Sequence, residues 1–429
     1  AIEQCNGAGV CRKLEGVMCP SFQTSQEEMH STRGRANLLR AMISGHFPHP
    51  ELGQQAVREA LDLCLACKGC KSECPSRVDI AKLKYEFLQH YYGNLSHMRP
   101  LRDYLFGYIS NLAKFSHYFA PAVNFMLSTK LVKSFGEKYI GLSSQRDFPK
   151  MSYRSLQREW KRHFKRYPQN GQAEEVLFLS DAFTEFFQPQ IGLAALKVMA
   201  KLGCKIHILS TLGAGRTLIS KGFLSAAEKH ARRLIEEIHH LDPSQKMPIV
   251  GIEPSEIYTL RDEYLDLFPD DMTGLNIAGR AYLLEEFLIR PGNDYEIRIK
   301  RLIKDTDKFS NEEVLFHGHC YQKAQPPAED GFPSGVEASV NLLKLAGYKV
   351  QVIDDGCCGM AGAFGYEKEH YRFSMQVAEL ALLPAIQKAM AENPMVMLCT
   401  SGVSCHAQIH DGSGIEPLHP IELIAKKFL

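Results

Sequence analysis

Cys64-Leu-Ala-Cys67-Lys-Gly-Cys70-Lys-Ser-Glu-Cys74-Pro75 is the stretch that decides the fold of the N-terminal part of this chain. Three cysteines separated by two residues each, then a fourth before proline, are typical of bacterial-type ferredoxins. In those proteins three thiolates bind one iron–sulfur cube and the fourth reaches a different cluster. Zinc sites also use Cys-x2-Cys pairs, but they usually place two pairs across a longer gap. We therefore predict iron–sulfur ligation and an electron-carrying protein.

A second cysteine motif, Cys5-Asn-Gly-Ala8-Gly-Val-Cys11 with Met18-Cys19-Pro20 after it, lies near the N-terminus. In each motif the cysteine before proline is expected to reach the cluster of the other motif. The first predicted [4Fe–4S] cluster is therefore bound by Cys19, Cys64, Cys67 and Cys70. The second predicted cluster is bound by Cys5, Cys11 and Cys74. Ala8 stands where the complete run has Cys67, so the second cluster is one thiolate short. It is either a [3Fe–4S] cluster or a [4Fe–4S] cluster with a ligand other than cysteine.

Length and composition indicate a soluble globular protein of more than one domain. The chain has 429 residues, of which 45% are hydrophobic and 23% charged, and its formal net charge of +1 argues against binding nucleic acid. Thirteen cysteines at ligand spacings favour metal binding in a reducing cytoplasm. No run of apolar residues is long enough to span a membrane, so contact with the inner membrane would be peripheral. The start at Ala1, without Met, suggests a piece of a longer polypeptide.

The pattern of helices and strands predicts a mixed fold: an α-helical ferredoxin domain followed by two tandem α/β cysteine-rich repeats. The ferredoxin domain covers residues 1–95, with helices over 36–42, 52–61 and 80–91. A helical, aromatic-rich connector covers 96–170. Its aromatic residues indicate either a membrane or quinone surface or helices packed over the clusters, and the polar interruptions favour packing. A basic helix over 154–166, with Trp160, is expected to be solvated ahead of a linker over 167–171.

The rest of the chain is an internal repeat, with one unit over 171–300 and another over 301–429. Glu175-Val-Leu-Phe178 recurs as Glu313-Val-Leu-Phe316, and Gly213-Ala-Gly215 lines up with Cys357-Cys-Gly359. Each unit is predicted as strand, helix, strand, glycine turn, helix and strand. In the first unit the strands are expected over 176–179, 205–209 and 248–252. Such alternation predicts parallel sheets covered by helices.

The two units differ in their thiols. The second unit carries Cys320, Cys357, Cys358 and Cys405, and the first has Ala182, Gly213, Ala214 and Glu256 at the equivalent positions. We predict that these four thiols bind metal, either a non-cubane [4Fe–4S] cluster or zinc. His317 and His319 are candidates to donate hydrogen bonds to sulfur. Cys204 and Cys399 are expected in buried strands instead.

Taken together, these motifs resemble the iron–sulfur halves of FAD-linked 2-hydroxyacid dehydrogenases. The resemblance is greatest to the C-terminal half of bacterial D-2-hydroxyglutarate dehydrogenase-type fusion proteins. It depends on Cys5-Asn-Gly-Ala-Gly-Val-Cys11-Arg, Met18-Cys19-Pro-Ser-Phe22, Arg33-Gly-Arg-Ala-Asn-Leu-Leu39, Cys357-Cys-Gly-Met-Ala-Gly362 and His419-Pro420. Glycolate oxidase iron–sulfur subunits are similar, as are one subunit of anaerobic glycerol-3-phosphate dehydrogenase and one of heterodisulfide reductase. The last of these shares the Cys-Cys-Gly units.

The resemblance implies a relay. A flavin (FAD) in a partner domain or subunit would oxidise a D-2-hydroxyacid such as D-2-hydroxyglutarate or D-lactate. The clusters of this chain would then pass electrons singly to a quinone or another acceptor, and the chain itself would contain no substrate-binding catalytic residue. Two alternatives remain open. One is a thiol–disulfide oxidoreductase of the heterodisulfide reductase kind that uses Cys357 and Cys358. The other is a zinc-bearing scaffold that positions the flavin half.

Overall fold

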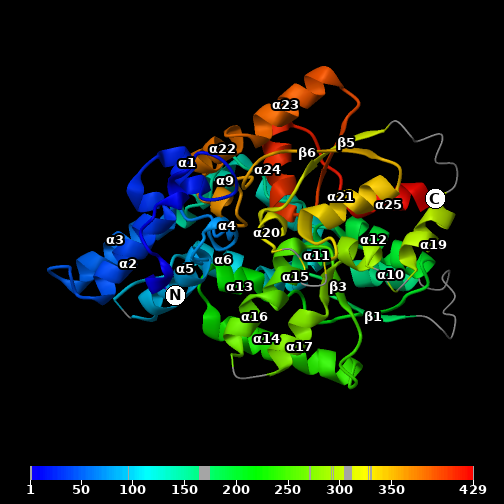
Figure 1. Ribbon diagram of the computed structural model, residues 1–429, viewed down its shortest axis with the longest axis horizontal. Helices are drawn as coiled ribbons and strands as arrows, with labels where there is room; N and C mark the ends of the chain where they lie inside the picture. The colour runs from blue at the N-terminus through cyan, green and yellow to red at the C-terminus, as the bar shows by residue number, and fades with distance from the viewer. Residues whose placement is uncertain are drawn as a thin grey trace.

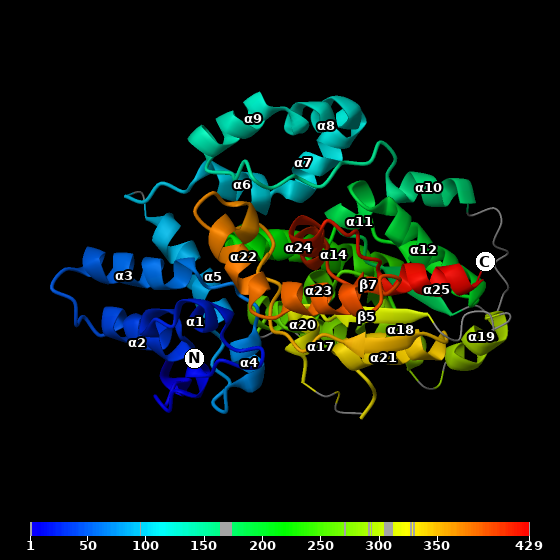
Figure 2. The ribbon, with the colours of Figure 1, turned by 90° about the horizontal axis from the view of Figure 1, so that it is seen from above.

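The computed structural model of the protein describes residues 2–94, 96–163, 174–269, 272–290, 292, 294–303, 312–326, 328 and 331–428. The helical N-terminal part lies at one end of the molecule and the α/β part at the other (Figure 1). Helices α6 to α9 form a separate layer along one side, above α22 and α24 (Figure 2). None of the described helices is both long enough and apolar enough to cross a bilayer.

The N-terminal part is built from short helices that surround the cysteine loops. It contains α1 (Pro20–Ser25), α2 (Thr32–Ile43), α3 (Pro50–Asp62), α4 (Gly69–Glu73) and α5 (Ile80–Gly93), with 3-10 turns η1 (Ile2–Gln4), η2 (Val10–Arg12) and η3 (Glu28–His30). The side chains of Ser31 and Asp79 cap α2 and α5, and Pro50 begins α3, as the local sequence favours. The three helices expected here are thus confirmed.

The connector folds into α6 (Leu101–Gly107), α7 (Ile109–Ser116), η4 (His117–Phe119), α8 (Ala120–Ser128), α9 (Lys130–Phe135) and the π-helical turn η5 (Gly136–Ile140). Most of its aromatic side chains are exposed, so the expectation that they pack over the clusters is wrong for them. The exposed fraction is 74% for both Phe115 and Phe125, and Tyr104, Tyr118, Phe119 and Phe135 are exposed as well. Phe106 and Tyr108 do contact buried cores.

Two small parallel sheets form the centre of the α/β part. The first has the order β2-β1-β3-β4, and the second has the order β6-β5-β7. Their strands are β1 (Glu175–Phe178), β2 (Lys205–Ile208), β3 (Ile249–Gly251), β4 (Ala281–Leu283), β5 (Glu313–His317), β6 (Lys349–Val352) and β7 (Met397–Thr400). The register repeats as well, because Glu175 pairs with Lys205 just as Glu313 pairs with Lys349.

Strand β4 was not expected from the sequence. The second unit has only a single parallel bridge, between Cys399 and Leu418, at the corresponding side of β7. A three-residue strand offers too short an apolar run to be distinguished from the helix that follows it. The three strands predicted for the first unit are confirmed within two residues at each end.

Helices cover both sheets and join the two units. The first unit has α11 (Ala182–Phe186), α12 (Pro189–Lys201), α13 (Arg216–Ser220), α14 (Leu224–Leu241), α15 (Pro254–Arg261), α16 (Glu263–Leu267), α17 (Met272–Gly279), α18 (Leu284–Ile289) and α19 (Tyr295–Leu302). The second has α20 (Cys320–Lys323), α21 (Gly335–Leu345), η8 (Phe364–Tyr366), α22 (Tyr371–Glu379), α23 (Leu382–Glu392), α24 (Val403–Ser413) and α25 (Pro420–Phe428). Helix α12 packs on α25 and α18 on α21, so one continuous apolar core contains both units.

The basic helix ahead of the first unit is amphipathic. Its described part is α10 (Leu156–His163), and residues 164–166 of the expected helix and the expected linker over 167–171 lie outside the described residues. The Trp160 side chain is buried in the shared core against α12. Its basic residues lie on the opposite, exposed face, which is the arrangement of an ordinary amphipathic surface helix.

Candidate metal centres

Six of the seven cysteines of the N-terminal motifs lie around one small core, and the seventh, Cys67, belongs to the core that the α/β part also forms. All seven are free thiols. Five are buried, namely Cys11, Cys19, Cys64, Cys67 and Cys70, whereas Cys5 and Cys74 are half-buried. The loop between Cys64 and Cys70 turns sharply because Ala66 and Lys68 adopt left-handed backbone conformations. Such a turn directs consecutive thiols of a Cys-x2-Cys-x2-Cys run toward one point.

The four cysteines predicted for the first cluster interact with one another. Burial raises the pKa of the Cys70 thiol, and Asp79, Cys64 and Cys19 raise it further. Burial also raises the pKa of Cys67, with contributions from Cys320, Cys19 and Cys70. Thiols so buried carry little charge by themselves, and a bound metal would stabilise their thiolate forms. The donor set therefore fits a cluster, although the ligand assignment itself remains a prediction.

The second predicted group lies nearer the surface. The backbone N–H of Arg33 donates to Cys11 Sγ at 3.3 Å, and Cys5 and Cys74 contact the same core. Ala8 is in an exposed turn, where its N–H donates to Asn6 Oδ1 at 3.0 Å. The position without a thiolate is thus at the solvent side of the motif. This arrangement is compatible with both predicted alternatives, a [3Fe–4S] cluster and a [4Fe–4S] cluster with a ligand other than cysteine.

A buried arginine lies against the first group. The Arg35 guanidinium donates from Nη1 to Cys19 Sγ at 3.3 Å and from Nε to the Ala60 carbonyl at 2.8 Å. Its side chain is only 1% exposed. Burial opposes its charge, but Cys64 and Cys19 raise the pKa of Arg35 above its ordinary value. Arg33 and Arg35 both lie in the first turn of α2, between the two motifs, which makes both candidates to compensate charge, but only the Arg35 side chain is buried against sulfur.

The cysteine loop of the ferredoxin part contacts the second α/β unit directly. Cys67 belongs to the same apolar core as Cys320, Tyr321 and Cys357. Beside it, Lys68 Nζ forms an ion pair with Glu263 at 2.6 Å, which fixes the loop on the first unit. Burial alone would lower the pKa of Lys68, but Glu263 and Asp262 raise it above its ordinary value. The two predicted metal regions are therefore neighbours although they lie about 250 residues apart in the chain.

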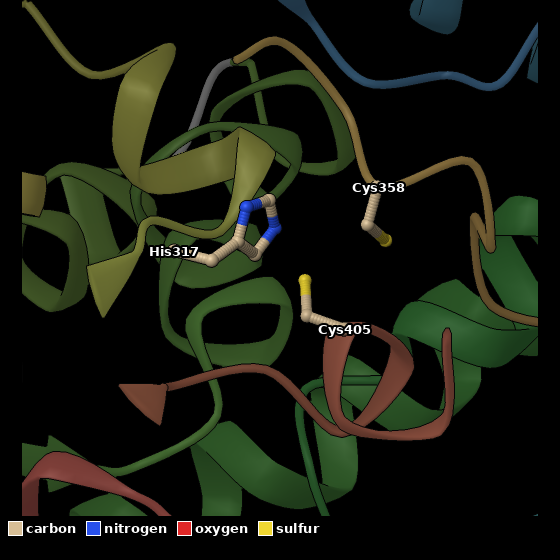
Figure 3. Close-up of side chains that lie close together, drawn as sticks. All are labelled: His317, Cys358 and Cys405. Atoms are coloured by element: carbon tan, nitrogen blue, oxygen red, sulfur yellow. The ribbon is translucent and has the colours of Figure 1, made fainter. Parts of the chain in front are cut away.

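Within the second unit, His317, Cys358 and Cys405 form a compact, buried potential metal-binding group. One ligand atom of each lies within 4.8 Å of the others, and all three side chains are buried. His317 ends β5, Cys358 lies in the loop after β6, and Cys405 lies in the first turn of α24; their side chains face one another (Figure 3). Parallel strands end at the same edge of a sheet, which explains the convergence.

The other two predicted thiols adjoin this group. The Cys357 thiol interacts with Cys320 and with Cys358, and Cys358 interacts with Cys405, so the four thiols are neighbours. The neighbouring thiols of Cys357 and Cys405 lower the pKa of Cys358 well below its usual range, although burial opposes this effect. Thiols and an imidazole are donors suited to iron–sulfur clusters and zinc alike. The residues present thus fit a metal group at this place.

The two histidines near this group have different surroundings. His317 Nδ1 lies 2.7 Å from Asp355 Oδ2, and the ring also interacts with the Cys358 thiol. Burial alone would lower the pKa of His317, but Asp355, which also pairs with Lys323, raises it. A carboxylate that orients an imidazole toward a metal is a common arrangement. His319 instead accepts from the Tyr321 N–H at 3.1 Å and caps α20.

From the sequence, His317 is expected only to donate a hydrogen bond to sulfur, whereas the geometry makes it a candidate ligand. The signal that would have identified it is its position as the last residue of β5, three residues before Cys320. The equivalent edge of the first unit holds Glu256, whose Oε2 accepts from the Ala214 N–H at 2.6 Å. Cys399 lies in buried β7 as expected, and Cys204 is buried immediately before β2.

Comparison with known proteins finds similarity both in the ferredoxin part and over most of the chain. Residues 1–78 match the 4Fe-4S dicluster domain. The D-2-hydroxyglutarate dehydrogenase of Escherichia coli is 27% identical over 98% of this chain and 43% of its own length. One subunit of the Escherichia coli anaerobic glycerol-3-phosphate dehydrogenase is 27% identical over 76% of this chain and 78% of its own length. The Escherichia coli glycolate oxidase iron–sulfur subunit is 31% identical, over only 18% of the chain.

This chain spans about two fifths of the length of the D-2-hydroxyglutarate dehydrogenases that it matches. The alignment with them includes both α/β units as well as the ferredoxin part, because it covers nearly the whole chain. The chain is accordingly a 4Fe-4S dicluster protein that aligns with the C-terminal half of D-2-hydroxyglutarate dehydrogenases and is related to a subunit of anaerobic glycerol-3-phosphate dehydrogenase and to glycolate oxidase iron–sulfur subunits.

Proposed function

We propose that this chain is the electron-transfer part of an FAD-linked D-2-hydroxyacid dehydrogenase, with D-2-hydroxyglutarate and D-lactate as candidate substrates. The flavin and the substrate site belong to a partner domain or subunit. This chain receives electrons one at a time and passes them to a quinone or another acceptor. Its place of action is the cytoplasm, with peripheral contact to the inner membrane.

The observation that carries this proposal is that Cys67 lies in one buried core with Cys320 and Cys357, and close enough to Cys320 for the two thiols to interact. Electron transfer between centres needs close approach through packed protein, and here a predicted ligand of one centre lies beside a predicted ligand of another. The residues that would hold the clusters are those named from the sequence, with His317 added beside Cys358 and Cys405. When bound, such groups supply reversible one-electron storage. Arg35 compensates charge at Cys19, and the ion pair of Lys68 with Glu263 fixes the cysteine loop on the first α/β unit.

Iron and acid-labile sulfide analysis of anaerobically purified protein, combined with EPR, tests the cluster content. Cys67→Ser is expected to remove or convert one EPR signal while the other signals remain. Cys204→Ser is the matched control, because Cys204 is equally buried but lies outside both groups. An unchanged iron count and spectrum in Cys67→Ser would contradict the assignment of the first cluster.

The role of the second unit is tested in an assembly reconstituted with its flavoprotein partner. Cys358→Ala is expected to slow reduction of the acceptor, because it interrupts the path beyond Cys67, while reduction of the flavin by substrate continues. Stopped-flow absorbance separates the two steps. Full metal content together with full acceptor turnover in this variant would mean that the path ends at the ferredoxin clusters.

One observation favours a second candidate function, thiol–disulfide reduction. Cys357 and Cys358 both line a cavity, and the pKa of Cys358 is lowered by its thiol neighbours, so a disulfide substrate has access to a nucleophilic sulfur. The two functions differ in one measurement. Reduced protein that cleaves a small disulfide such as oxidised dithiothreitol, and loses this activity in Cys358→Ala, would support the second candidate.

A further inference from the structure

A large cavity lies where the ferredoxin part, the connector and both α/β units meet. Its volume is about 1070 Å³. Cys64 lies in its wall on the ferredoxin side, and Cys357 and Cys358 lie in its wall on the side of the second unit. Aromatic side chains, including Tyr85 and Phe364, form much of the rest. A molecule held there would therefore contact both predicted metal regions.

Most of the surface that lines this cavity is apolar, but charged side chains also belong to the wall, and one of them lies beside a predicted ligand. Lys84 Nζ donates to the Cys64 carbonyl at 2.7 Å and belongs to the cavity wall. An ammonium group has three N–H donors, so it can also donate to an oxygen atom of a ligand. A mostly apolar cavity with a few oriented donors is typical of sites for planar organic ligands. The combination suits an aromatic ring that bears carbonyl oxygens.

Part of the wall is provided by the connector layer. Leu112, Val123 and Leu127 of α7 and α8 line the cavity. The same layer also carries exposed apolar side chains, namely Phe115, Tyr118, Phe119, Phe125, Met126, Leu131, Phe135 and Tyr139. The layer lies along one side of the molecule (Figure 2). The helices that line the cavity thus also carry exposed apolar surface.

The charge of the connector layer indicates which kind of partner its exposed surface binds. Residues 109–140 contain four lysines (Lys114, Lys130, Lys133 and Lys138) against one acidic residue, Glu137. The whole chain, by contrast, has a net charge of only +1, so basic charge is concentrated on this layer. Basic helices with exposed aromatic and aliphatic side chains bind the interface of anionic bilayers. A second copy of this chain would bring the same lysines against each other.

We propose that the cavity binds a lipid-soluble quinone, which enters from an anionic bilayer on which the layer from α7 to η5 rests. The proposal builds on the proposed function and names its acceptor and the place of reduction. In the step itself, the quinone takes two electrons, one at a time, from the reduced metal centres next to the cavity. It takes two protons from solvent and leaves as the quinol, while the centres return to their oxidised state. Lys84 positions one quinone oxygen near Cys64.

Filling the cavity from the connector side tests the binding site. Leu127→Trp adds an aromatic ring at the inner face of α8, and Leu131→Trp is the matched control at an exposed position. The protein with reconstituted clusters is reduced photochemically and mixed in a stopped-flow instrument with a short-chain ubiquinone analogue or with ferricyanide. Ferricyanide can accept electrons at the half-buried Cys5 and Cys74 without entering the cavity.

The expected result is that Leu127→Trp slows reoxidation by the quinone at least about tenfold while the ferricyanide rate stays within about twofold. Leu131→Trp is expected to behave as the wild type in both assays. Lys84→Met gives an independent test, and we expect it to weaken the apparent affinity for the quinone more than it changes the maximal rate. If the quinone reoxidised Leu127→Trp at the wild-type rate, the proposed binding site would be wrong. Absence of iron–sulfur clusters from the wild type would instead refute the proposed function.

Vesicle flotation tests the membrane surface. We expect the wild-type protein to float with vesicles of phosphatidylglycerol and phosphatidylcholine and to be released by high salt. The double variant Phe119→Glu/Phe125→Glu is expected to lose binding, and Met395→Glu, which changes an exposed side chain in the second unit, is expected to keep it. No binding by the wild type would overturn the proposal. A second result would also overturn the proposal. If the double variant still bound vesicles but had half the molecular mass of the wild type in light scattering, this surface would join two copies of the chain and would not bind the bilayer.

Discussion

Replacing Arg35 by methionine gives the sharpest test of how this protein sets the potential of its first predicted cluster. The guanidinium is buried and lies 3.3 Å from Cys19 Sγ, within hydrogen-bonding distance of a predicted cluster ligand. A positive charge stabilises the more negative, reduced state of a cluster. Arg35→Met is therefore expected to lower the midpoint potential.

The size of the shift follows from this distance. Two unit charges 3.3 Å apart attract each other by about 5 kcal/mol at an effective dielectric constant of about 20. The guanidinium charge is delocalised and the added electron is shared among several iron and sulfur atoms, which reduces the effect to about 1–3 kcal/mol. For a one-electron couple this corresponds to a shift of about 40–130 mV to lower potential.

A redox titration monitored by EPR measures this shift, and iron analysis verifies that the cluster is intact. Arg35→Lys keeps the charge and is expected to recover part of the potential, and Lys82→Met serves as a control that removes a surface cation. Removal of Arg35 also leaves the Ala60 carbonyl without its donor, at a cost of about 1–3 kcal/mol of stability. A midpoint potential unchanged within about 15 mV in a fully loaded Arg35→Met protein would refute the electrostatic argument.

Three other changes have defined outcomes. Ala8→Cys should shift the EPR spectrum toward an all-thiolate four-iron cluster, and wild-type protein that already shows two such clusters would contradict the interpretation of Ala8. Cys204→Ala should leave iron content unchanged but lower the unfolding free energy by about 1–2 kcal/mol in denaturant titrations, because Cys204 Sγ lies 3.2 Å from Tyr295 Oη. Burial and Asp181 raise the pKa of Glu256 to about 8, so the folded protein holds a proton that the unfolded chain releases. Its stability should therefore fall as pH rises between about 5 and 8, with a contribution of up to about 1.4 kcal/mol per pH unit that Glu256→Gln removes.

Short-range patterns carried most of what could be predicted from the sequence. The spacing of the cysteines from Cys64 to Cys74 is by itself typical of cluster ligands, so these ligands could be predicted without knowledge of the tertiary structure. The repeat was visible because both sheets begin with the same tetrapeptide pattern, at Glu175 and at Glu313. The parallel pairing then follows from the alternation of strands and helices, and the observed registers agree with it.

Features that depend on which face of a helix meets the rest of the molecule could not be predicted. The aromatic residues of the connector have the same local pattern whether they point inward or outward, and Phe115 and Phe125 point outward. Trp160 shows the reverse case, since its helix is basic but the indole is buried. The approach of Cys67 to Cys320 is likewise a tertiary contact between distant segments, which no spacing rule reports.

Comparison of the two α/β units shows how the same turn is satisfied with thiols in one unit and without them in the other. The turns at Gly215 and Gly359 have matching left-handed backbones, so both units expose backbone N–H groups at the same place. In the second unit the Gly359 N–H donates to Cys357 Sγ at 3.5 Å. In the first unit the Glu256 carboxyl accepts from the Ala214 N–H instead, and its burial keeps it protonated near neutral pH. An acceptor is required at this turn in both units because buried donors must be paired. The fold therefore does not require sulfur at this turn, which supports the proposal that the thiols of the second unit bind a metal.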